Sequence, residues 1–397
     1  MKKTRNIFED VNTEKSIDTS IKGGIIDQGR DEWRAGVSQW MKVLFILVCL
    51  MIIIGGLTRL TDSGLSITEW NVVKGALPPL NDAAWTLEFD KYKNIPEYQL
   101  QNKGMSLSDF KVIYWWEWGH RQLGRFVGIV WFAGFVYLNI KNRVPPPWKF
   151  RMLIVGLLGG LQGAIGWWMV SSGLVGRMVD VASYRLATHL GLAFVILGTL
   201  FWFIMKVERR DVDLMQSRRR RNVKSINWTS ILLVFAFAQI LLGALVAGID
   251  AGTGYIDWPL MNGEFLPSES FDYMPFWINL FENPALVQFN HRILGYLLML
   301  LGIIAWIKSR NIAHRKLRIG FKAILIMMII QMVLGILTVM YAAPWYIAIF
   351  HQIGAILLLV LILQTKFIAN FPQEQSLQAL KIETLICWTL LLKFHVH

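Results

Sequence analysis

Long apolar runs separated by polar connections make up most of this chain. A helix needs about 20 apolar residues to cross the hydrocarbon core of a bilayer, and eight runs reach this length. The pattern therefore predicts an all-α integral membrane protein with eight transmembrane helices embedded in a lipid bilayer. The predicted spans cover approximately residues 39–60, 119–140, 150–171, 186–206, 228–249, 288–307, 319–341 and 345–368.

Basic residues collect in alternate connections. The connection after the fourth span contains Arg209, Arg210 and the run Arg218–Arg221, whereas residues 250–287 contain no Lys or Arg. Basic loops stay on the cytoplasmic side, so both termini are predicted to be cytoplasmic and residues 61–118 and 250–287 to face outward from a bacterial inner (plasma) membrane. The predicted cytoplasmic parts are an N-terminal segment 1–38, a basic linker 207–227 and a tail 369–397.

An internal repeat relates the two halves of the chain. The stretch from Gly55 to Trp70 aligns with the stretch from Gly243 to Trp258 at a constant offset of 188 residues, so that Asp62, for example, aligns with Asp250. Because each half contains four spans, an even number, both halves enter the membrane in the same orientation. The sequence thus predicts two parallel-repeat four-helix bundles, residues 39–206 and residues 228–368.

Composition narrows the class of partner. The net charge of +13 arises from 40 Lys and Arg against 27 Asp and Glu, in a chain that is 54% hydrophobic. In a membrane protein this excess belongs to cytoplasmic loops, so no nucleic acid partner is predicted. Cys49 and Cys387 are the only cysteines, and they provide neither a disulfide framework nor a cysteine metal site.

Four histidines occupy equivalent places in the repeat. His120 and His291 belong to matching His-Arg-x-x-Gly segments, and His189 and His351 begin the fourth and eighth spans. All four lie in the first turns of spans that run inward, so each half presents two histidines at similar depth near the outer face. Two imidazoles that face each other across a helix bundle suit axial ligation of a heme iron.

Other interpretations of the histidines fit less well. A single intramembrane histidine can simply bond to a neighbouring helix, but four equivalent ones favour a shared role. Zinc would need further carboxylate or cysteine ligands beside both histidines of a pair, and none recurs. Glycines on the same spans provide faces without side-chain bulk for a porphyrin, although close helix packing is the alternative. These are Gly124, Gly128, Gly191, Gly295 and Gly354.

Charged residues beside the histidines suggest further roles. Arg121, Arg125 and Arg292 are candidates to pair with heme propionates, and the alternative for them is snorkelling to the membrane surface. Glu117 lies three residues before His120 and shares its helix face. The equivalent position in the second half, three residues before His291, is Gln288. A carboxylate in one half only suggests acid or base chemistry there; the alternative is an ion pair with Arg121.

Several motifs together resemble heme A synthase, in its proteobacterial and mitochondrial branch. They are the segments Gly55–Ser66, Trp70–Leu80, Glu117–Arg121 and Ile256–Gly263. The resemblance covers roughly residues 38–368 and includes motifs from both halves in order. Members of the other branch carry a cysteine pair in the first outer segment, which this chain lacks, so no thiol step is expected.

The resemblance implies an activity and a division of labour. The expected reaction oxidises the C8 methyl of heme O, through successive hydroxylations, to the formyl group of heme A, which terminal oxidases use. His120 and His189 would hold the substrate, Glu117 would be the essential carboxylate, and His291 and His351 would hold a heme B cofactor. The expected partners are the farnesyl-transferring enzyme that makes heme O and an electron donor, and glycine-rich helix faces would permit a homo-oligomer.

Two other function classes compete with this expectation. A diheme b-type membrane electron carrier would use the same histidines with both hemes permanent. A transporter built from parallel repeats would have broken spans and a site near the midplane, which the position of the histidines near one face disfavours. The heme content of the purified protein separates the first class from the enzyme.

Overall fold

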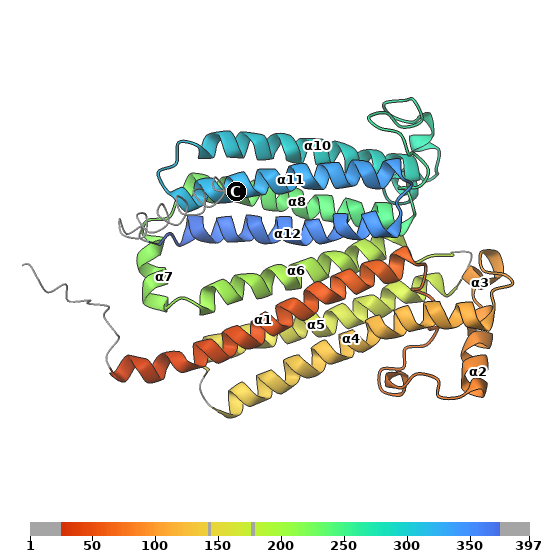
Figure 1. Cartoon of the computed structure of the whole chain (residues 1–397), viewed down its shortest axis with the longest axis horizontal. Coiled ribbons are helices and arrows are strands. Elements are labelled where there is room, and N and C mark those ends of the chain that lie inside the picture. Colours follow the sequence, from red (N-terminus) through yellow and green to blue (C-terminus); the bar gives the residue numbers. More distant parts are fainter. Residues whose placement is uncertain (1–24, 142–143, 176–178, 374–397) are drawn as a thin grey trace, which may run out of the picture.

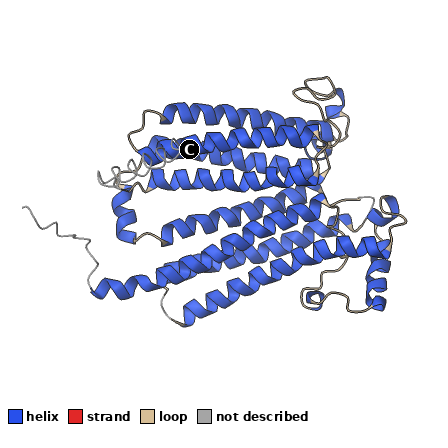
Figure 2. Ribbon diagram, in the orientation of Figure 1, coloured by secondary structure: helices blue, strands red, loops and turns tan. Residues whose placement is uncertain are grey.

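The computed structural model describes residues 25–141, 144–175 and 179–373, and within these ranges all named elements are helical (Figure 2). Eight of the described helices are long and apolar enough to cross a membrane, which confirms the all-α integral membrane class. They are α1 (Ile25–Leu60), α4 (Leu107–Ile140), α5 (Pro146–Gly173), α6 (Ser183–Val207), α8 (Val223–Gly248), α10 (Pro284–Ser309), α11 (Arg315–Met340) and α12 (Trp345–Asn370).

The long helices form two groups that lie side by side. Helices α1, α4, α5 and α6 pack together, and so do α8, α10, α11 and α12 (Figure 1). The seam between the groups is formed by α6 against α8 and by α1 against α12. The side-chain amide of Gln352 in α12 crosses this seam and donates a 2.6 Å hydrogen bond to the carbonyl of Ile52 in α1.

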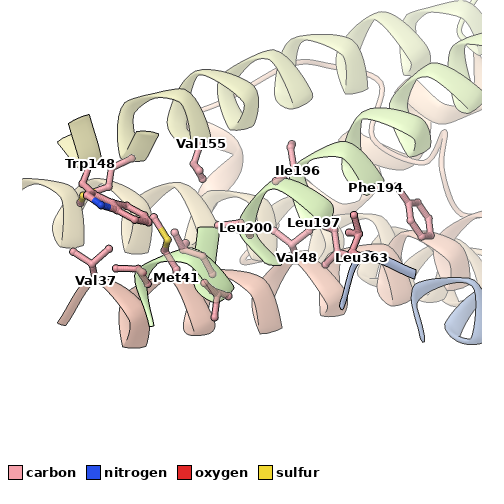
Figure 3. Close-up of a cluster of buried hydrophobic side chains, with 14 of the residues drawn as sticks. Val37, Met41, Val48, Trp148, Val155, Phe194, Ile196, Leu197, Leu200 and Leu363 are labelled. Carbon is pink, nitrogen blue, oxygen red and sulfur yellow. The ribbon is translucent and has the colours of Figure 1, made fainter. Parts of the chain in front are cut away.

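The largest buried apolar cluster lies in the first group and reaches the seam (Figure 3). It joins side chains of α1, α5 and α6 to Leu363 of α12, whereas large apolar side chains on α4 and α5, such as Phe132 and Leu157, point outward. Helices that are apolar on both their inner and outer faces are those of a protein surrounded by lipid. The labelled members are Val37, Met41, Val48, Trp148, Val155, Phe194, Ile196, Leu197, Leu200 and Leu363.

The two ends of the helix groups differ. The end covered by residues 61–106 and 249–283, here the capped end, carries α2 (Asp82–Lys93), α3 (Pro96–Leu100), α9 (Asn279–Glu282) and three short 3-10 helices, Lys74–Ala76, Ser268–Phe271 and Phe276–Ile278. The opposite end, here the basic end, carries α7 (Asp211–Arg218) and the arginines that follow it (Figure 1).

Helix boundaries depart from the hydropathy pattern at the capped end. Helix α4 begins at Leu107 rather than near residue 119, because Ser106 and Asp109 form a capping box at its start. Its added turns bury Phe110 and Tyr114 against α2, so packing against the cap supports them. At the basic end, α1 (Ile25–Leu60) includes the last residues of the predicted segment 1–38. The remainder of that segment and most of the predicted tail, residues 1–24 and 374–397, lie outside the described residues.

Candidate histidine sites

The structure brings the four predicted histidines together in pairs at the capped end. The ring centroids of His291 in α10 and His351 in α12 are 6.4 Å apart, with an angle of 79° between the ring planes. In the other group, His189 of α6 lies within electrostatic range of His120 of α4. An imidazole nitrogen binds a transition metal at about 2.0–2.1 Å, so two rings on one ion have centroids roughly 6 Å apart. The spacing of the second pair is that of two ligands of one metal.

Each histidine ring is received by a glycine of the preceding long helix. A Cβ atom added at any of these glycines would lie within 3.2 Å of the ring carbon Cε1, closer than side chains normally approach. Only glycine allows the helices to approach this closely. The pairs and the distances of the added Cβ are Gly55 and His120 at 2.8 Å, Gly166 and His189 at 2.9 Å, Gly243 and His291 at 3.1 Å, and Gly335 and His351 at 3.2 Å.

These four glycines are site residues that the sequence analysis missed. The repeat contained the signal, because Gly55 and Gly243 align at the offset of 188 residues and Gly166 and Gly335 recur in matching Gln-x-x-x-Gly segments. Some of the glycines singled out from the sequence pack against a neighbouring helix. Gly191, for example, receives Leu241 of α8 across the seam, which is a helix-packing contact.

The donor set of each pair suits a tetrapyrrole better than a bare metal ion. Among the described residues, no group of three or more His, Cys, Asp or Glu is placed to hold a metal, so zinc would lack ligands. A heme iron takes four ligands from its own ring and needs only the axial two. The Nδ1 atoms of His120 and His351 are buried without a protein partner, and the residues present therefore fit bis-histidine heme ligation.

Glu117 is buried beside the first pair and is tightly held. Its side chain is only 3% exposed. One carboxylate oxygen accepts hydrogen bonds of 2.7 Å from the Ser66 hydroxyl and 2.7 Å from the Ile67 backbone N–H. The other oxygen accepts a 3.0 Å bond from Nε of Arg121. The ion pair with Arg121 is therefore present, and it forms part of a wider network that fixes the carboxylate.

Gln288 replaces this carboxylate in the second half and reverses the direction of the hydrogen bond to the cap backbone: Glu117 accepts from the backbone, whereas Gln288 donates to it. Its amide nitrogen donates a 3.2 Å hydrogen bond to the backbone carbonyl of Tyr255, a position 188 residues after Ile67. The side-chain oxygen of Gln288 is buried without a partner. The first half thus has a fixed, ionisable group at this point, and the second half has a neutral amide.

Arg121 and Arg292 fasten the two caps in matching ways. Arg121 donates hydrogen bonds of 2.9 and 2.8 Å to the carbonyls of Glu69 and Ile67. Arg292 donates bonds of 3.0 and 2.9 Å to the carbonyls of Asp257 and Tyr255. Both guanidinium groups are therefore engaged with cap backbone.

Arg125 differs from the other two arginines. Its Nε and Nη2 donate to the carbonyls of Val72 and Asn71, each at 2.9 Å. Its Nη1 is buried without a partner. Among the three arginines predicted to face propionates, Arg125 thus retains an uncommitted nitrogen.

An apolar cavity of about 590 Å³ lies at the seam, away from the four histidines. It runs along α6 from Phe194 to Phe203 and is completed by α8 and α12. Val195 and Val234 in its wall are exposed, so the cavity opens to the lipid side. It contains none of the polar groups described above.

The fold and the two histidine pairs define a class: a polytopic membrane protein suited to hold tetrapyrrole iron at one end of each of two helix groups. Over residues 38–363 the sequence matches the family model COX15-CtaA, described as cytochrome oxidase assembly protein. This match covers most of the chain, and the chain therefore belongs to that family.

Curated relatives extend the match to nearly the full length. A heme A synthase of Dinoroseobacter shibae is 54% identical over 379 residues, which cover 95% of this chain and 99% of that protein. A heme A synthase of Roseobacter denitrificans is 52% identical over 380 residues, covering 95% and 100%. A heme A synthase of Paracoccus denitrificans is 50% identical over 374 residues, covering 94% and 98%. The chain is thus a membrane-embedded member of an enzyme family.

Proposed function

We propose that this protein is a heme A synthase that oxidises the C8 methyl of heme O to a formyl group. The observation that carries the proposal is the contrast between Glu117 and Gln288 at equivalent places beside the two histidine pairs. The names of the relatives support the product. The contrast supports placing the chemistry in the first half, because a buried carboxylate lies next to the histidines there and a neutral amide takes its place in the second half.

The substrate heme O is assigned to His120 and His189, and a resident heme B to His291 and His351. Heme B at the second pair would supply a one-electron relay to the first. The 6.4 Å centroid separation of the second pair supports the assignment of an axial pair there. The glycines that receive all four rings support the same coordination in both halves.

Glu117 would handle protons during the oxidation. After two hydroxylations the methyl carbon carries two hydroxyl groups, and loss of one water molecule gives the formyl group. A carboxylate that takes a proton from one hydroxyl and returns it to the departing one would assist this dehydration. Ser66, Ile67 and Arg121 hold Glu117 in one position, and such fixed orientation favours catalysis.

Helix α5 also supports a substrate role for the first half. Added Cβ atoms at Gly159 and Gly163 would meet nothing within 4 Å. The corresponding positions of α11 are Met328 and Met332, by the offset of 169 that relates Gln162 to Gln331. The third span of the first half therefore has no side chain at two positions where the second half has methionines, and the room this leaves supports a substrate that must enter and leave.

Arg125 is proposed as a partner for a propionate of the substrate heme, because its Nη1 is buried and uncommitted. Arg121 and Arg292 would contribute mainly by holding the caps over the two pairs. Their charges would still favour anionic propionates nearby.

The proposed location is the bacterial inner membrane, with both termini cytoplasmic and the capped end outward. The arginines of the basic end and the lack of Lys and Arg in residues 250–287 support this orientation. Two parallel four-helix bundles remain the proposed architecture, supported by the matching arginine bonds of the two halves. A farnesyl-transferring reaction must supply heme O. Each hydroxylation removes two electrons from the methyl carbon, so an external oxidant such as dioxygen must act together with the electron donor that serves the resident heme.

Pigment analysis tests the function against a diheme electron carrier. Protein expressed with a heme O source should contain heme B together with heme O or heme A. Protein expressed without that source should contain heme B alone. Its total heme content should be about half that of the protein expressed with the source. Heme B in both sites, with no heme O or A under either condition, would contradict the synthase and favour the carrier.

A further inference from the structure

Three of the four histidines receive a hydrogen bond from a glutamine of the preceding long helix. In each case the amide nitrogen donates to the backbone carbonyl of the histidine, and the glutamine lies one turn before the glycine that receives the ring. The bonds are from Gln162 to His189 at 3.0 Å, from Gln239 to His291 at 2.9 Å and from Gln331 to His351 at 3.0 Å.

In two of the three cases, the glutamine amide also lies against the imidazole ring. The amide nitrogen of Gln239 is 3.2 and 3.3 Å from the two ring nitrogens of His291, and that of Gln162 is 3.3 and 3.4 Å from those of His189. Since the two distances are nearly equal, the amide is not directed at either lone pair. The contact restrains the ring and leaves a nitrogen available to a metal.

The glutamines are not explained by stability alone. The side-chain oxygens of Gln162, Gln239 and Gln331 are all buried without a partner. A buried oxygen that lacks a donor destabilises a fold. The recurrence of this arrangement beside three histidines indicates that it serves the histidines.

The fourth position, beside His120, is occupied by Met51. Met51 lies one turn before Gly55, and its terminal methyl is 3.7 Å from a Cβ added at Gly124, four residues after the histidine. In the second half, the amide nitrogen of Gln239 is 3.2 Å from a Cβ added at the equivalent Gly295. Met51 therefore fills the space of a glutamine, but a thioether has no hydrogen to donate.

We propose that Gln162, Gln239 and Gln331 are positioning residues that fix three axial histidines, and that Met51 makes His120 the exchangeable ligand through which the substrate heme enters and the product leaves. The inference rests on the proposed function. A synthase must release one heme while it retains another, yet the glycines against the histidine rings are alike in both halves. One missing hydrogen bond on one of four ligands provides that difference.

Heme release from the purified holoprotein tests the proposal. The protein, loaded with heme O or A, is mixed with excess apomyoglobin, and the transferred pigments are separated chromatographically over time. Met51→Gln should slow the release of heme O and A about tenfold, the effect of one added hydrogen bond, and leave heme B unchanged. Met51→Leu, which has similar volume and no donor, is the matched control and should release heme O and A as the original protein does.

Gln239→Met is the reciprocal change. It should speed heme B release about tenfold and leave heme O and A unaffected. It should also shift the low-spin electron paramagnetic resonance signal of heme B, because that signal depends on the angle between the two imidazole planes, which is 79° for His291 and His351. A merely structural loss would lower heme content without changing the signal of the heme that remains.

Two results would overturn the proposal: unchanged release of heme O and A from Met51→Gln, or unchanged heme B release and resonance signal in Gln239→Met. If Met51→Gln does not accumulate, Gln162→Met replaces it and should speed release of heme O and A. A preparation that contains only heme B contradicts the proposed function instead. In that case slower release of half of the heme B from Met51→Gln would still support the positioning role.

Discussion

The two halves of the molecule share a frame and differ at single positions within it. Both halves place two histidines against glycines at the capped end, and both fasten their cap with an arginine that follows a histidine. The first half has Glu117, Met51 and open glycines on α5 where the second has Gln288, Gln239 and methionines. The comparison supports the proposals that the shared frame binds a group in each half and that a few substitutions determine the chemistry and the exchange of that group.

The largest expected effect comes from replacing one of the glycines against which a histidine ring packs. Gly243→Leu should abolish heme B binding, since a side chain there would displace the ring of His291, whose Cε1 is already 3.1 Å from an added Cβ. Gly166→Leu should instead abolish binding of heme O through His189. Chromatographic pigment analysis measures both. Loss of the same pigment from the two variants would break the assignment of different hemes to the two halves.

Glu117→Gln makes the first half resemble the second at its carboxylate. Heme A formation should fall at least about 100-fold, because loss of a general acid or base typically costs 10²–10⁴-fold, while heme B content should not change. Conversion of heme O to heme A in membranes provides the measurement. Gln288→Glu in the second half is the control and should retain heme A formation; activity retained in Glu117→Gln would reduce Glu117 to a local ion-pair partner.

Gly163→Met gives α5 the residue that α11 carries at Met332. The added side chain occupies space that is open in the first half, so heme O occupancy should fall about tenfold or more, by analogy with overpacking costs of about 1–3 kcal/mol. Heme B serves as the internal reference in the same chromatogram. A fall in both pigments would indicate general misfolding rather than a substrate space.

The smallest expected effect is a difference between the two caps in how their stability depends on pH. Burial raises the pKa of Glu97 to about 8, with further contributions from the charges of Asp180, Glu117 and Asp62. In the second cap, a hydrogen bond from Tyr255 lowers the pKa of the exposed Glu269. Because the folded protein keeps a proton on Glu97 that the unfolded chain releases above a pKa of about 4.3, the stability of the first cap should fall as pH rises from there towards 8.

Glu97→Gln removes this pH dependence. The variant should be more stable than the original protein at pH 8.5, by a few degrees in thermal unfolding, and the difference should shrink at pH 6. Hydrogen exchange in residues 82–105 localises the effect to the first cap. Glu269→Gln is the matched control and should not gain stability at high pH; an equal gain in both variants would show that the caps do not differ in this respect.

Hydropathy and spacing predicted the membrane class, the eight helices and the residues Glu117, His120, His189, His291 and His351. They did so because lipid imposes a length on every span, because the repeat marks the four histidines that both copies share, and because Glu117 stands out as a difference between the copies. The start of α4 was misplaced, since its first turns are supported by packing of Phe110 and Tyr114 against α2, a tertiary contact that a hydropathy pattern does not contain. The arginines were identified, but their bonds to cap carbonyls depend on loop paths that no local pattern specifies.

The sequence by itself thus determined which residues recur and in which element each lies. Only the tertiary structure decided which side chains meet: that Gly55 receives His120, that Gln239 donates to His291, and that Met51 takes the corresponding place beside His120. The physical reason is that such contacts depend on how closely and at what rotation two helices pack. Those quantities are set by all the side chains between the helices together, and no single stretch of sequence contains them.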